Sequence, residues 1–157
     1  MRSVGSNLSE TYEAEPESVG RARAAIAKFA ADAGATRGQI DDIRLATSEA
    51  VTNSVLHAYR GCTGSIQLTA AIVSDELWVL IADDGCGMQP RSDGPGLGLG
   101  LGLISQVSDD LAIAPRSSGG TELRMRFPLE HSERSRRTCA TPRGARDHQS
   151  SPTSSRR

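Results

Sequence analysis

Glu49 and Asn53 stand four residues apart in a segment whose apolar spacing predicts a helix, so both side chains lie on one face, about 6 Å apart along the axis. The amide oxygen of asparagine is a hard, neutral ligand of the kind that Mg²⁺ accepts beside phosphate oxygens and waters. A glutamate one turn away is placed to orient or deprotonate a nucleophile that attacks a phosphoryl group. The pair also fits a solvated helix edge, and His57, next in the row, also fits a bond to a final helix carbonyl.

A second group of residues, Asp83 to Gly87, follows the apolar stretch Leu77 to Ala82. A carboxylate at the end of a buried strand is costly unless it has a hydrogen-bond donor, and the amino group of a purine is such a donor. Gly85 and Gly87 allow positive φ angles and the close approach of a flat ring to the backbone. An ordinary Asp-Asp-Gly turn is the alternative interpretation.

Glycine occupies every second position from Gly94 to Gly102, mostly alternating with leucine. In a regular element each glycine costs several tenths to about 1 kcal/mol relative to alanine, which suggests a backbone that glycine alone permits. We expect a mobile lid that leads into a helix N-terminus, where free N–H groups would face a triphosphate. Low-complexity sequence in a loop is the alternative.

Because Lys28 is the only lysine, a phosphate loop ending in Gly-Lys-Ser/Thr is excluded.

Three helices, one of them short, and five strands are expected to position these residues. The first strand covers residues 7–14, and the helices run from about 17 to 33 and from about 38 to 58. Pro16 suits the first helical position, Gly34 the end of that helix, and Thr36 the cap of the next.

Alternating apolar residues indicate two hairpins in the second half of the chain, with turns at 73–76 and 117–120 and a short helix at about 100–107 between them. Strands that occur mostly in hairpins indicate an α+β fold. We expect a two-layer α/β sandwich, in which a mixed, mostly antiparallel sheet has helices on one face and its other face exposed.

The chain of 157 residues, with 37% hydrophobic content, is long enough for one domain, which we expect at residues 1–129. Residues 130–157 contain seven Arg and three acids but almost no large apolar side chain, which predicts a disordered Arg/Ser-rich tail. Such a basic tail fits contact with nucleic acid or acidic lipid, but it lacks interleaved aromatics, so we expect a solvated extension without direct nucleic-acid binding.

The apolar runs fall short of the roughly 20 residues that a membrane span requires. Three cysteines without CxxC spacing argue against a disulfide framework and against a zinc site. A cytoplasmic protein without a membrane partner is therefore expected.

With these segments in this order, residues 7–129 resemble the histidine-kinase-like ATPase superfamily, also called GHKL or Bergerat, which includes DNA gyrase B and the sensor kinases. The resemblance is strongest to its anti-sigma-factor serine/threonine kinases. It rests on residues 45–59 (LATSEAVTNSVLHAY), on the Asp83–Gly87 loop, on the Gly-Leu segment and on Gly119-Gly120-Thr121.

The resemblance implies a Bergerat ATPase fold that binds ATP with Mg²⁺. By this resemblance Asn53 would be the magnesium ligand, Glu49 the general base and Asp83 the adenine acceptor, with Thr121 assisting through a shared water. Among the glycines it implies that Gly85 and Gly87 lie near the purine and that Gly98 and Gly100 lie near the phosphates.

The activity implied is that of a protein serine/threonine kinase that sequesters a sigma factor or similar client and phosphorylates an anti-anti-sigma-type antagonist. A homodimer is implied by the same analogy. Two alternatives stay open at this point: a binding module in which ATP shapes a partner surface without turnover, and an acidic α+β domain that binds no nucleotide.

Overall fold

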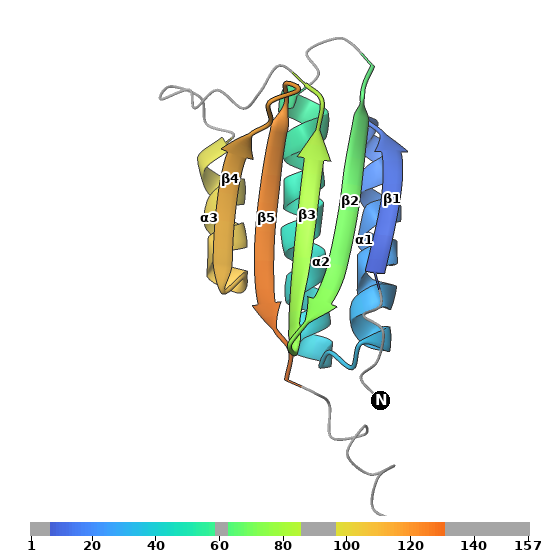
Figure 1. Cartoon of the computed structure of the whole chain (residues 1–157), viewed down its shortest axis with the longest axis vertical. Coiled ribbons are helices and arrows are strands. Elements are labelled where there is room, and N and C mark those ends of the chain that lie inside the picture. Colours follow the sequence, from blue (N-terminus) through green and yellow to red (C-terminus); the bar gives the residue numbers. More distant parts are fainter. Residues whose placement is uncertain (1–6, 59–62, 86–96, 131–157) are drawn as a thin grey trace, which may run out of the picture.

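The computed structural model describes residues 7–58, 63–85 and 97–130 of the chain. Five strands form one sheet in the order β1-β2-β3-β5-β4, and the helices α1, α2 and α3 all cover one face of it (Figure 1). The elements are β1 (Asn7–Glu13), α1 (Pro16–Asp32), α2 (Arg37–Asn53), a π-helical turn η1 (Ser54–Ala58), β2 (Ser65–Val73), β3 (Glu76–Asp83), α3 (Leu97–Val107), β4 (Asp110–Pro115) and β5 (Thr121–Pro128). The predicted two-layer sandwich is confirmed.

The two long helices begin and end where local chemistry favours it. Pro16 is the first residue of α1, and Gly34 follows its end with a φ of 89°. Thr36 caps α2 in a capping box, because its hydroxyl accepts from the Gln39 amide and the Gln39 side chain accepts from the Thr36 amide. These boundaries agree with the sequence predictions.

The end of the second helix differs from the prediction, which had a single helix continuing to residue 58. Regular α-helix stops at Asn53, and η1 follows as one wider turn. A π-helical turn changes the direction in which the following side chains point, and such turns occur often at functional sites. Here it follows directly after Asn53, where Ser54 is buried and hydrogen-bonded to the sheet.

All four strand pairings among the described residues are antiparallel, whereas the sequence interpretation expected a mixed, mostly antiparallel sheet. The connection from β3 through α3 to β4 does return the chain in the same direction. However, β5 lies between these two strands and runs antiparallel to both, so the two parallel strands never pair.

The core lies between the helices and the sheet. Ile26, Ile43 and Val51 of α1 and α2 are fully buried against alternate residues of the strands, among them Ile66 and Val79. Burial of each such side chain stabilises the fold by about 1.5–3 kcal/mol. Among the described residues, no helix covers the opposite face of the sheet (Figure 1). There the guanidinium groups of Arg124 and Arg126 lie 5.7 and 5.8 Å from the centre of the Trp78 ring.

Both hairpin turns occur where the sequence placed them. Ser74 and Asp75 have φ angles of 50° and 63°, and Gly119 and Gly120 have φ angles of 90° and 88°. The short helix α3 begins at Leu97 and not near residue 100, so Gly98 and Gly100 lie within its first turn. Buried Ile104 anchors it to the core.

Two sequence predictions fall wholly or partly outside the described ranges: the part of the glycine-rich lid before Leu97, and the tail from residue 131 onwards. Within the described residues, no helix is both long enough and apolar enough to cross a membrane.

Candidate functional site

The structure places Glu49 and Asn53 in the last turns of α2, facing the first turn of α3. Asn53 is only 4% exposed, and its side-chain nitrogen has no hydrogen-bond partner among the described residues. A buried amide without a partner is unfavourable by about 1–3 kcal/mol, so such groups in native proteins call for an explanation. A ligand that binds from outside the chain would provide one.

Gly100 of α3 lies directly against this pair. A Cβ atom at Gly100 would be 3.0 Å from the Glu49 Oε2 atom and 3.5 and 3.6 Å from the two amide atoms of Asn53. The backbone at this point therefore approaches both polar side chains as closely as a residue without a side chain permits. The N-terminal turn of α3, with the positive end of the helix dipole, thus lies beside Asn53.

Asp83 ends β3 and is 2% exposed, yet its carboxylate has donors on both oxygens. Oδ1 accepts from the amides of Gly85 and Thr121, both at 3.1 Å, and Oδ2 accepts from the hydroxyl of Ser54, also at 3.1 Å. These bonds offset the cost of burying the charge and fix the orientation of the carboxylate.

Ser54 connects the two predicted groups of site residues. It follows Asn53 in the chain, and its hydroxyl donates to Asp83 across 29 positions of sequence. The end of α2 and the end of β3 are therefore neighbours. Sequence reasoning did not single out Ser54; a polar residue at an inward position of the helix was the available indication.

The hairpin between β4 and β5 packs on the backbone of Asp83. A Cβ atom at Gly120 would lie 1.9 Å from the Asp83 carbonyl oxygen, so only glycine fits there. Thr121, which follows, is buried and donates its amide to Asp83. Sequence reasoning singled out Thr121 for a water-mediated role, and the structure adds this direct backbone contact.

The predicted site residues Glu49, Asn53, Asp83, Gly85, Gly98, Gly100 and Thr121 all lie in α2, at the end of β3, in the first turn of α3 or at the start of β5. Gly87 lies outside the described residues. The contacts above bring Asp83, Gly85, Ser54 and Thr121 together at one point and Glu49, Asn53 and Gly100 at the next.

The donor set fits a magnesium-bound nucleotide. The unpartnered amide nitrogen of Asn53 is a donor that suits an oxygen of the ligand, and its amide oxygen is a hard, neutral ligand of the kind that Mg²⁺ accepts. The glycine beside it leaves space that a side chain would fill. Among the described residues no three His, Cys, Asp or Glu side chains cluster as metal ligands.

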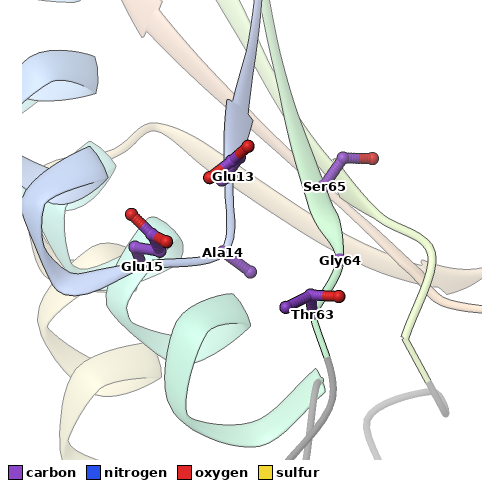
Figure 2. A pocket seen from close by; sticks show the side chains of 6 residues that line it. All are labelled: Glu13, Ala14, Glu15, Thr63, Gly64 and Ser65. Carbon is purple, nitrogen blue, oxygen red and sulfur yellow. The ribbon is translucent and has the colours of Figure 1, made fainter.

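One hollow of about 480 Å³ opens at the junction of β1 and α1 with the start of β2 (Figure 2). Its lining consists of Glu13, Ala14, Glu15, Thr63, Gly64 and Ser65, and so includes none of the predicted site residues. It adjoins the candidate site through Ser65, whose hydroxyl donates to Asp84 at 3.3 Å.

A family model of the histidine kinase-like ATPase domain matches residues 12–127, a range that spans all three groups of residues described above. The chain belongs to the histidine kinase-like ATPase family. The expected superfamily is thereby confirmed.

Curated relatives place the chain in the anti-sigma-factor branch of that family. The anti-sigma F factor of Clostridium acetobutylicum is 31% identical over 126 residues, which cover 73% of this chain and 88% of the relative. That of Caldanaerobacter subterraneus is 34% identical over 115 residues, covering 66% and 80% of the two chains.

A solved structure agrees with this placement. The crystal structure of the RsbU and RsbW domains of Rv1364c from Mycobacterium tuberculosis matches with a TM-score of 0.63 and 26% identity. The match covers 79% of this chain and 32% of the longer chain.

Proposed function

We propose that this chain is an ATP-binding anti-sigma-type kinase: it holds a sigma factor or similar client and transfers the γ-phosphoryl group of ATP to a serine or threonine of an antagonist protein. The main support is the hydrogen bond from Ser54 to Asp83, because it makes neighbours of the end of α2, with Asn53, and the end of β3. A single nucleotide can reach both places only if they adjoin.

In this proposal the adenine amino group donates to the Asp83 carboxylate, with Thr121 beside it and the Gly85 backbone against the ring. The phosphates lie along the first turn of α3, which contains Gly98 and Gly100, and the backbone of Gly100 lies beside Glu49 and Asn53. Asn53 holds Mg²⁺, which supplies neutralisation of phosphate charge when bound.

Glu49 is the proposed general base. It lies one helical turn before Asn53 on the same face, and its carboxylate oxygen borders the space above Gly100. From there it accepts the proton of the attacking hydroxyl as the phosphoryl group is transferred.

The partners follow from the relatives' names. Proteins called anti-sigma F factors are named for a sigma factor, so we propose a sigma factor or similar protein as client and an anti-anti-sigma-type protein as antagonist. Two further parts of the proposal are a homodimer, which rests on the resemblance, and a cytoplasmic location, which rests on the short apolar runs and the cysteine pattern of the sequence.

Binding and transfer are tested separately. Equilibrium dialysis with Mg-ATP should show binding by wild type and strongly reduced binding by Asp83→Asn, because an amide in place of the carboxylate presents a donor to the adenine amino group. Equal binding by both proteins would contradict the nucleotide assignment.

Transfer is measured with γ-labelled ATP and candidate antagonist proteins. Glu49→Gln should lower label transfer by at least about 100-fold, the usual scale for loss of a general base, while nucleotide affinity changes little. Glu17→Gln, at the exposed start of α1, is the matched control. Bound ATP without transfer by wild type to any antagonist would favour the non-catalytic ATP-dependent binding module.

A further inference from the structure

Arg116, just before the turn between β4 and β5, reaches across to the end of β3. One of its guanidinium nitrogens donates to the backbone carbonyl of Asp83 at 3.2 Å and to the carboxylate of Asp84 at 2.7 Å. It thus contacts the two residues that precede Gly85 in the predicted purine loop. Nothing in the family resemblance or the comparisons assigns a role to this residue.

The Asp84 carboxylate that Arg116 contacts is held from a second side as well. Ser65, at the start of β2, donates its hydroxyl to the other carboxylate oxygen at 3.3 Å. Gly120 and Thr121 contact Asp83 from the same hairpin that contains Arg116. The turn after β3 is therefore fixed by β2 on one side and by the β4–β5 hairpin on the other.

A contribution to fold stability alone is a weak explanation for these contacts. The side chain of Asp84 is 59% exposed and that of Arg116 is 28% exposed. Ion pairs of this kind are screened by solvent and contribute little to the free energy of unfolding. Their geometry is specific, however, because a single guanidinium nitrogen spans a backbone carbonyl and the next residue's carboxylate.

We propose that Arg116 is a positioning residue for base recognition: it holds the Asp83–Gly85 turn so that the Asp83 carboxylate meets the amino group of adenine. This inference rests on the proposed function and adds the source of its base selectivity. Arg116 acts through Asp83 and Asp84, not by touching the nucleotide.

The chemistry of the two purines gives a test that separates positioning from general destabilisation. Adenine has an amino group at its 6-position and guanine has an oxygen acceptor there, so a fixed carboxylate favours ATP and repels GTP. If Arg116 fixes that carboxylate, its loss should weaken ATP binding and narrow the ATP-to-GTP affinity ratio. A structural role would lower the affinity for both nucleotides by the same factor.

The experiment measures the dissociation constants of Mg-ATP and Mg-GTP by titration calorimetry for wild type, Arg116→Ala and Arg116→Lys, together with their melting temperatures. For Arg116→Ala we expect ATP affinity to fall about fivefold, the scale of one lost hydrogen bond, while GTP affinity changes less. Arg116→Lys, which keeps the charge and one donor, should recover part of the selectivity. Arg44→Ala, which removes a surface ion pair near the start of α2, is the control.

A double-mutant cycle with Asp84→Ala tests the route. If Arg116 acts partly through Asp84, the double variant should lower the ATP-to-GTP affinity ratio by a smaller factor than the product of the factors in the two single variants. If wild type binds Mg-ATP but Arg116→Ala has the same ATP-to-GTP affinity ratio as wild type, this inference is overturned and the kinase proposal still stands. Failure of wild type to bind Mg-ATP would instead overturn the proposed function.

Discussion

Asp83 is the residue on which the proposed site depends most, because its carboxylate is the proposed acceptor for adenine. A carboxylate has about four lone-pair sites, and three donors from the described residues occupy it: the amides of Gly85 and Thr121 and the hydroxyl of Ser54. The remaining capacity suits one further donor, which in the proposal is the adenine amino group. Each of the three protein donors fixes the direction of that last acceptor position.

The first prediction concerns the Ser54 donor. Ser54→Ala removes the bond to Asp83 and leaves one carboxylate oxygen without this partner, so the free energy of unfolding should fall by about 1–2 kcal/mol. Affinity for Mg-ATP should fall about fivefold because the carboxylate is less well oriented. Calorimetry and denaturant unfolding measure the two effects.

Ser105→Ala is the matched control for that substitution, since the Ser105 hydroxyl is exposed and donates to the Gly102 carbonyl of its own helix. It should leave ATP affinity unchanged. If Ser54→Ala also left affinity unchanged, the orientation of Asp83 would not depend on this hydroxyl.

At the scale of elements, the site is assembled by two places where the backbone of a glycine packs closely against another element. The first turn of α3 lies against Glu49 and Asn53 through Gly100, and the β4–β5 hairpin lies against Asp83 through Gly120. The two approaches differ in how strictly they require a residue without a Cβ atom. At Gly120 the neighbour is rigid backbone, whereas at Gly100 it is the flexible end of a glutamate.

The second prediction follows from the rigid neighbour. Gly120→Ala would place a Cβ atom 1.9 Å from the Asp83 carbonyl at a φ of 88°, so the hairpin must separate from β3. We expect a loss of at least about 2 kcal/mol in the free energy of unfolding and a marked loss of ATP affinity.

Gly119→Ala separates strain from steric clash in this turn. Its φ of 90° is equally unfavourable for alanine, but the nearest atom to its Cβ would be 3.9 Å away. It should cost only about 1–2 kcal/mol. Equal effects of the two substitutions in urea unfolding would show that the contact with Asp83 is unimportant.

The third prediction concerns the flexible neighbour. Gly100→Ala presses a methyl group towards Glu49, whose side chain can move, while alanine improves helix propensity by about 1 kcal/mol. The protein should therefore stay folded but lose label transfer and nucleotide affinity. Gly102→Ala lies on the same helix, and the added methyl group would have no atom within 4 Å apart from the backbone of its own helix. It should stabilise α3 and leave both label transfer and nucleotide affinity unchanged.

At the scale of the whole molecule, the site lies where four elements converge. α2 and α3 supply one side, and the ends of β3 and β5 supply the other. A ligand that contacts both sides binds the folded chain and not the unfolded one, so it must raise the melting temperature by mass action.

The fourth prediction is the size of that stabilisation. At a Mg-ATP concentration 100 times the dissociation constant, the gain should be about 2.7 kcal/mol, which shifts the melting temperature of a chain of this size by roughly 5–10 °C. Chelation of Mg²⁺ with EDTA should remove most of the shift. Calorimetric melting of Asp83→Asn, which should show almost no shift, provides the comparison.

The sequence by itself determined most of the elements and singled out the candidate site residues. Local chemistry was enough for Pro16, Gly34, Thr36 and the two hairpin turns, because each depends on interactions within a few residues of chain. Helical spacing singled out Glu49 and Asn53, and the place after an apolar strand singled out Asp83, but only the family resemblance assigned roles to them.

Tertiary structure alone decided how these residues meet. The bond from Ser54 to Asp83, the contact of Arg116 with the same turn and the insertion of β5 between β3 and β4 all join residues distant in sequence. The sequence also did not predict the π-helical turn after Asn53, because its residues suit a regular helix equally well. Such contacts depend on how the elements pack, and residue spacing along the chain gives no measure of packing.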